Sequence, residues 1–130
     1  MRQFLYFGNL IFNAAQVVWI DFAAFDKDNK PAVEVKVIGD DQTWTLIGAD
    51  RDAAFEWHVQ HSSRINRDSL FAFGTKVFNL NEIRWVNRDY QDDNGRALEI
   101  VTTDGTSWKL KDDDADKATR YFDNMEAQSA

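Results

Sequence analysis

Residues 7–20 read Phe-Gly-Asn-Leu-Ile-Phe-Asn-Ala-Ala-Gln-Val-Val-Trp-Ile, and residues 73–86 read Phe-Gly-Thr-Lys-Val-Phe-Asn-Leu-Asn-Glu-Ile-Arg-Trp-Val. The two stretches share a Phe-Gly pair, a Phe-Asn pair and a Trp at the same spacing. Self-similarity in register is the signature of a repeated architecture. The match indicates an internal duplication, with copies at about residues 4–61 and 70–126, inside a single domain that spans residues 1–130.

The remainder of each copy predicts further strands and a closing helix. Val33, Val35 and Val37 alternate with charged residues, which is typical of a half-buried strand. Asn94-Gly95 is a strong hairpin signal, since both turn residues must tolerate a positive φ. Helical spacing predicts one helix from about residue 50 to residue 61 and another that begins near residue 112.

Each copy is therefore expected to have the order β-β-β-β-α. The predicted fold class is α+β, with two antiparallel four-stranded β-sheets each followed by a helix. The copies would form a tandem repeat with pseudo-two-fold symmetry, a pseudo-dimer that resembles a homodimer fused into one chain. The alternative is a single barrel closed by one C-terminal helix, similar to the pleckstrin-homology fold.

Composition limits the class of protein. The chain has 130 residues, 44% of them hydrophobic and 14% aromatic, which is enough for a packed core. It has no Cys, and we expect a cytoplasmic protein. The apolar N-terminal stretch is interrupted by Gly8, Asn9 and Asn13, so we expect neither a signal peptide nor a membrane span. The formal net charge of −7 argues against binding nucleic acid through the whole surface.

The order of elements resembles the superfamily of single-stranded DNA-binding transcriptional regulators, which includes the Whirly, Pur and positive-cofactor coactivator families. The resemblance covers nearly the whole chain but lies in the β-β-β-β-α order alone. It implies a curved sheet that binds single strands with aromatic and basic side chains.

Residues 61–90 form the only long stretch with a positive balance of charge. Arg84 and Arg88 have the same strand parity and flank Trp85, so we expect them to line one groove. The competing interpretation is scattered surface charge that makes weak pairs. The candidate ligand-binding residues are Arg64, Arg67, Lys76, Arg84, Trp85 and Arg88.

The matching tryptophans allow two interpretations. Trp19 with Trp85, and Trp44 with Trp108, could supply stacking platforms for nucleobases. Each of the four, however, shares its strand face with an aliphatic neighbour, and that pattern favours packing in the core.

Metal and catalytic motifs are incomplete. His58 and His61 are three residues apart on a predicted helix, but no third ligand has recognisable spacing, so we expect no metal and no cofactor. Asp26 and Asp28 begin a calcium-loop pattern that fails because Pro31 occupies the position of the required Gly. No nucleophile elbow, phosphate-binding loop or Ser/His/Asp arrangement is recognisable, and we expect that the protein is not an enzyme.

The sequence therefore predicts a non-enzymatic binding module, and single-stranded nucleic acid is one expected partner. The alternative is a protein-interaction module, an acidic adaptor or inhibitor with a basic protein partner. Exposed Trp rings beside Arg84 and Arg88 would favour nucleic acid, whereas buried Trp rings and an all-acidic face would favour a protein. The oligomeric state is left open.

Overall fold

The computed structural model describes residues 4–61, 70–92 and 95–129. The chain divides into two compact units, unit 1 (Met1–Glu82) and unit 2 (Ile83–Ala130), and each is described by itself. A single domain over residues 1–130 stays a prediction.

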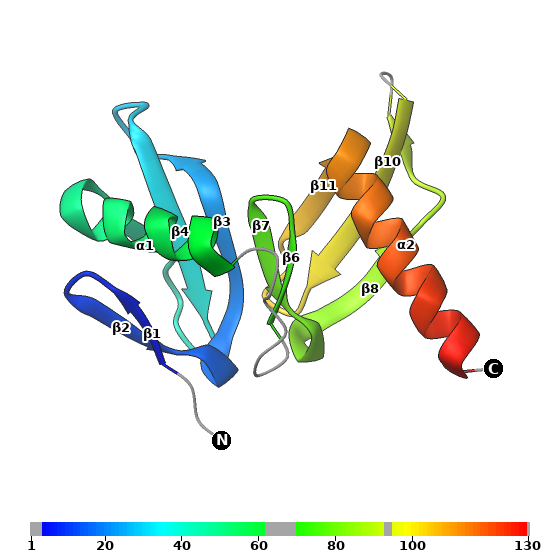
Figure 1. Ribbon diagram of the computed structural model, residues 1–130, viewed down its shortest axis with the longest axis horizontal. Helices are drawn as coiled ribbons and strands as arrows, with labels where there is room; N and C mark the ends of the chain where they lie inside the picture. Colours follow the sequence, from blue (N-terminus) through cyan, green and yellow to red (C-terminus); the bar gives the residue numbers. More distant parts are fainter. Residues whose placement is uncertain (1–3, 62–69, 93–94, 130) are drawn as a thin grey trace. The chain divides into compact units, whose positions relative to one another are not determined.

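Unit 1 is built on an antiparallel five-stranded sheet in the order β5-β4-β3-β7-β6 (Figure 1). Its strands are β3 (Val17–Phe25), β4 (Pro31–Val37), β5 (Trp44–Leu46), β6 (Leu70–Phe73) and β7 (Lys76–Asn79). Helix α1 (Gly48–His61) contacts β3 and β4 of this sheet, and its bounds agree with the predicted helix.

A separate hairpin begins the unit. Strands β1 (Phe4–Phe7) and β2 (Leu10–Asn13) pair only with each other among the described residues, and α1 contacts β1. Gly8 has a φ of 67° at the hairpin turn, a conformation that residues with a side chain rarely adopt. Alternation along β1 buries Leu5 and Phe7 and exposes Phe4 and Tyr6.

Aromatic rings fill the core of unit 1. The ring centroid of Phe7 lies 5.9 Å from that of Phe12, 6.1 Å from that of Phe22 and 5.5 Å from that of Trp57. The Phe22 and His58 rings stack with their centroids 4.4 Å apart. The hairpin, the sheet and α1 are therefore joined by one set of ring contacts.

Two short 3-10 helices follow matching hairpins, η1 (Ala14–Gln16) and η2 (Leu80–Glu82). Asn13 Oδ1 accepts a hydrogen bond from the Ala15 amide at 3.1 Å, and Asn79 Oδ1 accepts one from the Asn81 amide at 3.0 Å. The shared asparagines thus stabilise the turns that follow the two hairpins.

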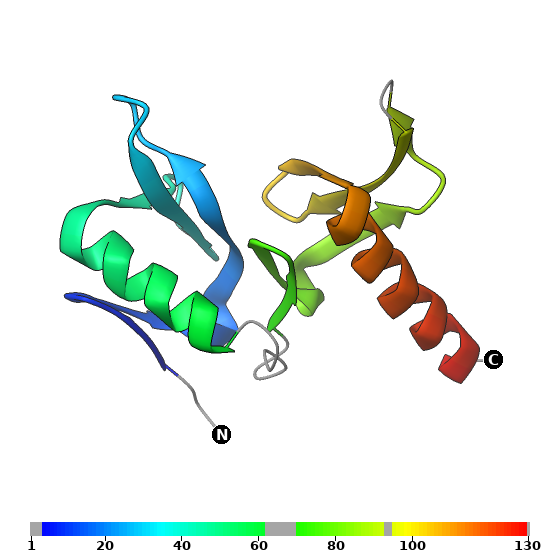
Figure 2. The ribbon, with the colours of Figure 1, turned by 45° about the horizontal axis from the view of Figure 1, so that its top comes forward.

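Unit 2 is an antiparallel sheet in the order β11-β10-β8, with β9 paired to the start of β10. Its elements are β8 (Ile83–Asn87), β9 (Gln91–Asp92), β10 (Gly95–Thr102), β11 (Ser107–Lys111) and α2 (Asp112–Ser129). Helix α2 packs on β10 and β11 (Figure 2). The predicted hairpin before β10 is present, although residues 93–94 at its turn lie outside the described part of the chain.

The predicted fold class was wrong. The structure has a five-stranded sheet, a smaller sheet on β10 and a two-stranded hairpin, rather than two equivalent four-stranded sheets each followed by a helix. β7 pairs with β3, with Phe78 opposite Trp19, so the second hairpin completes the sheet of unit 1. The internal repeat and the pseudo-dimer are therefore not supported. The barrel alternative is wrong as well, because the strands form separate sheets.

Candidate functional site

The structure distributes the predicted site residues over both units. Arg84 and Trp85 lie on β8, and Arg88 lies in the turn that follows it. Lys76 lies on β7 of unit 1. Arg64 and Arg67 lie outside the described residues.

Strand β8 forms one edge of the sheet in unit 2. Trp85 pairs with Val101, Val86 pairs with Ile100 and Asn87 pairs with Glu99, so Trp85 and Asn87 share one face. Five residues along this strand and turn are exposed: Arg84, Trp85, Asn87, Arg88 and Asp89. We call the first four of them the β8 edge.

Trp85 is 46% exposed, so the core interpretation is wrong for this residue. Trp44 is 45% exposed, whereas Trp19 is only 6% exposed and belongs to the interior as predicted. The Trp44 indole Nε1 donates a hydrogen bond to Asp40 Oδ2 at 3.0 Å, which places that ring in acidic surroundings.

Arg84 lies where the register between β8 and β10 shifts. Its Nη2 donates a hydrogen bond to the backbone oxygen of Thr103 at 3.1 Å, and the residue as a whole is exposed. A bulge changes the direction of a side chain at a sheet edge. Strand parity in the sequence does not predict this change.

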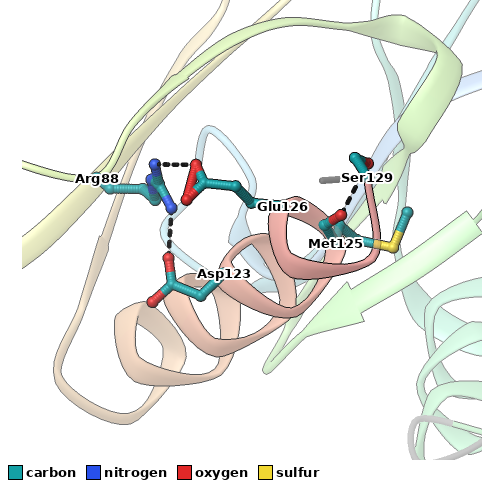
Figure 3. Close-up of polar contacts among 5 residues, drawn as sticks. All are labelled: Arg88, Asp123, Met125, Glu126 and Ser129. Atoms are coloured by element: carbon teal, nitrogen blue, oxygen red, sulfur yellow. Dashed lines mark hydrogen bonds and ion pairs between the residues drawn. The ribbon is translucent and has the colours of Figure 1, made fainter.

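Arg88 is held by helix α2. Its Nη1 pairs with Asp123 Oδ1, and its Nη2 lies 2.9 Å from Glu126 Oε2 (Figure 3). The two carboxylates are three residues apart on α2 and so share one helix face. Their hydrogen bonds raise the pKa of Arg88 above its already high ordinary value, so the guanidinium stays charged.

The turn that holds Arg88 borders an open hollow of about 510 Å³, lined by Val86, Asn87, Arg88, Asp89, Thr119 and Asp123. The Asp89 amide donates to Asn87 Oδ1 at 3.0 Å and closes this turn. Arg88 and the Thr119 side chain thus border the same space, which is reached from solvent.

Lys76 is engaged within the sheet of unit 1. Its Nζ lies 2.8 Å from Asp21 Oδ1, and both side chains are at least three-quarters buried. Asp21 pairs with Lys76 on one side and with Glu34 on the other, so a charged row crosses β7, β3 and β4. Burial first, and the Asp21 charge second, raise the pKa of Glu34.

Besides Arg84 and Arg88, unit 2 places a third cation, Lys109, close to an aromatic ring, that of Tyr90, and the sequence interpretation named neither residue. Lys109 Nζ lies 5.7 Å from the centroid of the Tyr90 ring. Lys109 pairs with Glu99, which also pairs with Asn87, so Lys109 lies on the face that carries Trp85. Alternation along residues 107–111 was the signal that could have placed Lys109 there.

The two histidines bond to backbone oxygens. His58 Nε2 donates to the Gly74 oxygen at 2.9 Å, and His61 Nδ1 donates to the Trp57 oxygen at 2.8 Å. No group of three His, Cys, Asp or Glu with metal-binding geometry occurs in the described part of the chain. Within the same residues, no helix has the length and apolar character needed to cross a membrane.

No family model matches the sequence, and no curated protein matches it. The structure is similar to a solved LytTr DNA-binding domain of a putative methyl-accepting/DNA response regulator from Bacillus cereus. The TM-score is 0.52 and the sequence identity 13%, over 92% of each chain. At this identity the likeness shows the fold alone. It gives no support to the Whirly, Pur or positive-cofactor families that the order of elements resembled.

Proposed function

We propose that this chain is a non-enzymatic DNA-binding module that binds through the β8 edge, with single-stranded DNA preferred over duplex. The observation that carries the proposal is the exposed Trp85 ring, flanked along the chain by the exposed Arg84 and Arg88. The likeness in fold to a domain that is named as DNA-binding supports it.

The chemistry of the edge suits an unpaired strand. Base stacking on an exposed aromatic ring contributes about 1–3 kcal/mol per base and is tolerant of sequence. A guanidinium group binds phosphate oxygens in a planar, bidentate arrangement, which Arg84 and Arg88 can supply. Lys109 adds a further cation on the face of Trp85. In a duplex the bases are stacked on one another inside the helix, so they are not accessible for stacking on the Trp85 ring.

The test is a titration of a labelled single-stranded 12-mer, and of its duplex, by fluorescence anisotropy at low and moderate salt. We expect Trp85→Ala to weaken single-strand binding about 5- to 150-fold, the equivalent of about 1–3 kcal/mol. Trp85→Phe should retain most of the affinity because it keeps a ring.

Trp44→Ala is the matched control, since Trp44 is equally exposed but donates to Asp40 in unit 1. We expect no effect from Trp44→Ala and a weaker complex in Arg84→Ala. Equal losses from the two tryptophan changes would contradict a site at the β8 edge, and tighter binding of the duplex would contradict the single-strand preference.

The second candidate is a protein partner with a basic surface, favoured by the net charge of −7 and by the acidic face of α2. Electrostatic complementarity governs partner choice at such surfaces. Absence of oligonucleotide binding even at low salt would eliminate the DNA proposal and leave this candidate.

A further inference from the structure

Arg88 differs from the other members of the β8 edge because it has two ionic partners. Asp123 and Glu126 present carboxylate oxygens to its two terminal nitrogens (Figure 3). This is the planar arrangement in which arginine also receives two oxygens of a phosphate group. The carboxylates therefore occupy the positions that a backbone phosphate would take.

The ion pairs lie at the surface and are open to exchange. The side chains of Arg88, Asp123 and Glu126 are 41%, 55% and 69% exposed. Exposed pairs of this kind contribute little to stability and weaken with salt. Arg88 also lines the open hollow beside these ion pairs, together with Asp89 and Asp123.

We propose that α2 regulates the β8 edge as an intramolecular competitor, in which Asp123 and Glu126 hold Arg88 until a DNA phosphate displaces them. This inference rests on the proposed function and adds to it the regulation of the same site. After displacement, the Asp123 and Glu126 carboxylates lie beside the bound DNA strand. They therefore repel any negatively charged ligand that approaches this surface without forming an ion pair with Arg88.

The test is a cycle of four proteins: wild type, Asp123→Asn with Glu126→Gln, Arg88→Ala, and the triple variant. Each is titrated with the labelled single-stranded 12-mer at low salt. We expect the amide substitutions to tighten binding about 3- to 10-fold in the wild-type background, a change of the size associated with exposed ion pairs. In the Arg88→Ala background the gain should fall to the smaller value expected from removing charge alone, because there is then no guanidinium to release.

Asp112→Asn with Asp113→Asn is the matched control, because it removes the same charge from the first turn of α2. We expect a smaller gain from this control. An equal gain from the control, or an unchanged gain in the Arg88→Ala background, would show general repulsion and overturn the inference. Failure of all variants to bind at low salt would overturn the proposed function itself, whereas wild-type binding without coupling to Arg88 would overturn the inference alone.

Discussion

Gly8, at the turn of the first hairpin, lies close to Asp50 of α1. Asp50 lies in the first turn of α1, and its Oδ1 accepts a hydrogen bond from the Asn9 amide at 3.0 Å. A Cβ atom built on Gly8 would lie 2.1 Å from that same oxygen and 3.0 Å from the Asp50 Cα. The lack of a side chain at residue 8 thus permits both the turn and the contact.

We predict that Gly8→Ala destabilises the protein by roughly 2–4 kcal/mol. A positive φ costs a non-glycine residue about 1–2 kcal/mol, and the clash with Asp50 and the loss of its hydrogen bond add to that cost. Urea unfolding followed by tryptophan fluorescence measures the change.

Gly39→Ala is the control, since Gly39 has a φ of 86° but nothing within 4 Å of an added Cβ. It should show the backbone cost alone, about 1–2 kcal/mol. Equal effects of the two substitutions would contradict the contact between the hairpin and α1.

Among the elements, β3 is the central strand of the five-stranded sheet in unit 1, because it pairs with β4 on one edge and with β7 on the other. The charged row Glu34, Asp21 and Lys76 crosses these three strands. Lys76 Nζ lies 2.8 Å from Asp21 Oδ1, and Glu34, in a partly buried position, lies beside the same Asp21 carboxylate.

We predict that Glu34→Gln stabilises the protein at pH 7 by less than about 1 kcal/mol, a small effect because the side chain is partly open to water. The pKa of Glu34 is raised in the folded state, so folding favours the protonated carboxyl and stability falls as pH rises through and above the ordinary value of 4.5. Glutamine cannot ionise and avoids that loss.

Urea unfolding at pH 7 and at pH 3.5 compares the two proteins. The advantage of Glu34→Gln should be present at pH 7 and vanish at pH 3.5, where both the folded and the unfolded chains carry a protonated Glu34. An advantage that grows on acidification would contradict the raised pKa.

The positions of the elements could be predicted from the sequence, but their pairing could not. Periodicity placed α1 and the strand of Val33 correctly. Strand pairing depends on which surfaces become buried, and identical local motifs do not encode it. Thus the hairpin of Gly8 forms a sheet of its own, whereas that of Gly74 joins β3.

In the candidate site, too, local features could be predicted from the sequence and tertiary contacts could not. The positive charge balance of residues 61–90 indicated Arg84 and Arg88 as candidates. Only the structure shows that Arg88 forms ion pairs with Asp123 and Glu126 of α2. The partners are separated by 35 and 38 residues along the chain, beyond any local pattern. Trp85 was a candidate site residue, but the favoured core interpretation of its ring was wrong, because alternation with Ile83 is equally compatible with a packed face and an open one.

For the whole molecule, the net charge of −7 means that long-range electrostatics repel a nucleic acid and affinity depends on local contacts. If Arg84, Arg88 and Lys109 neutralise two to three phosphates, the logarithm of the association constant should fall with the logarithm of salt concentration with a slope of about −1.4 to −2.1 for a single strand.

Titrations of the 12-mer at four salt concentrations give this slope, and Arg84→Ala should reduce its magnitude by about 0.7. Lys27→Ala is the control, because Lys27 lies in the exposed turn between β3 and β4 of unit 1. A slope steeper than about −4 would point to a larger basic surface than the β8 edge provides.

The pairing of β7 with β3 sets an order of events on the ribosome. Chains emerge from the N-terminus, and residues 4–61 supply the first hairpin, three strands of the large sheet and α1 before β6 and β7 exist. Until residue 79 has emerged, one edge of β3 is open and the core positions of Leu70 and Val77 are unfilled. An open edge is a template for wrong pairing between nascent chains. Unit 2, whose strands are consecutive in sequence, carries no such delay. A pause in translation between α1 and β6 would therefore prolong the time during which this edge of β3 is open to wrong pairing.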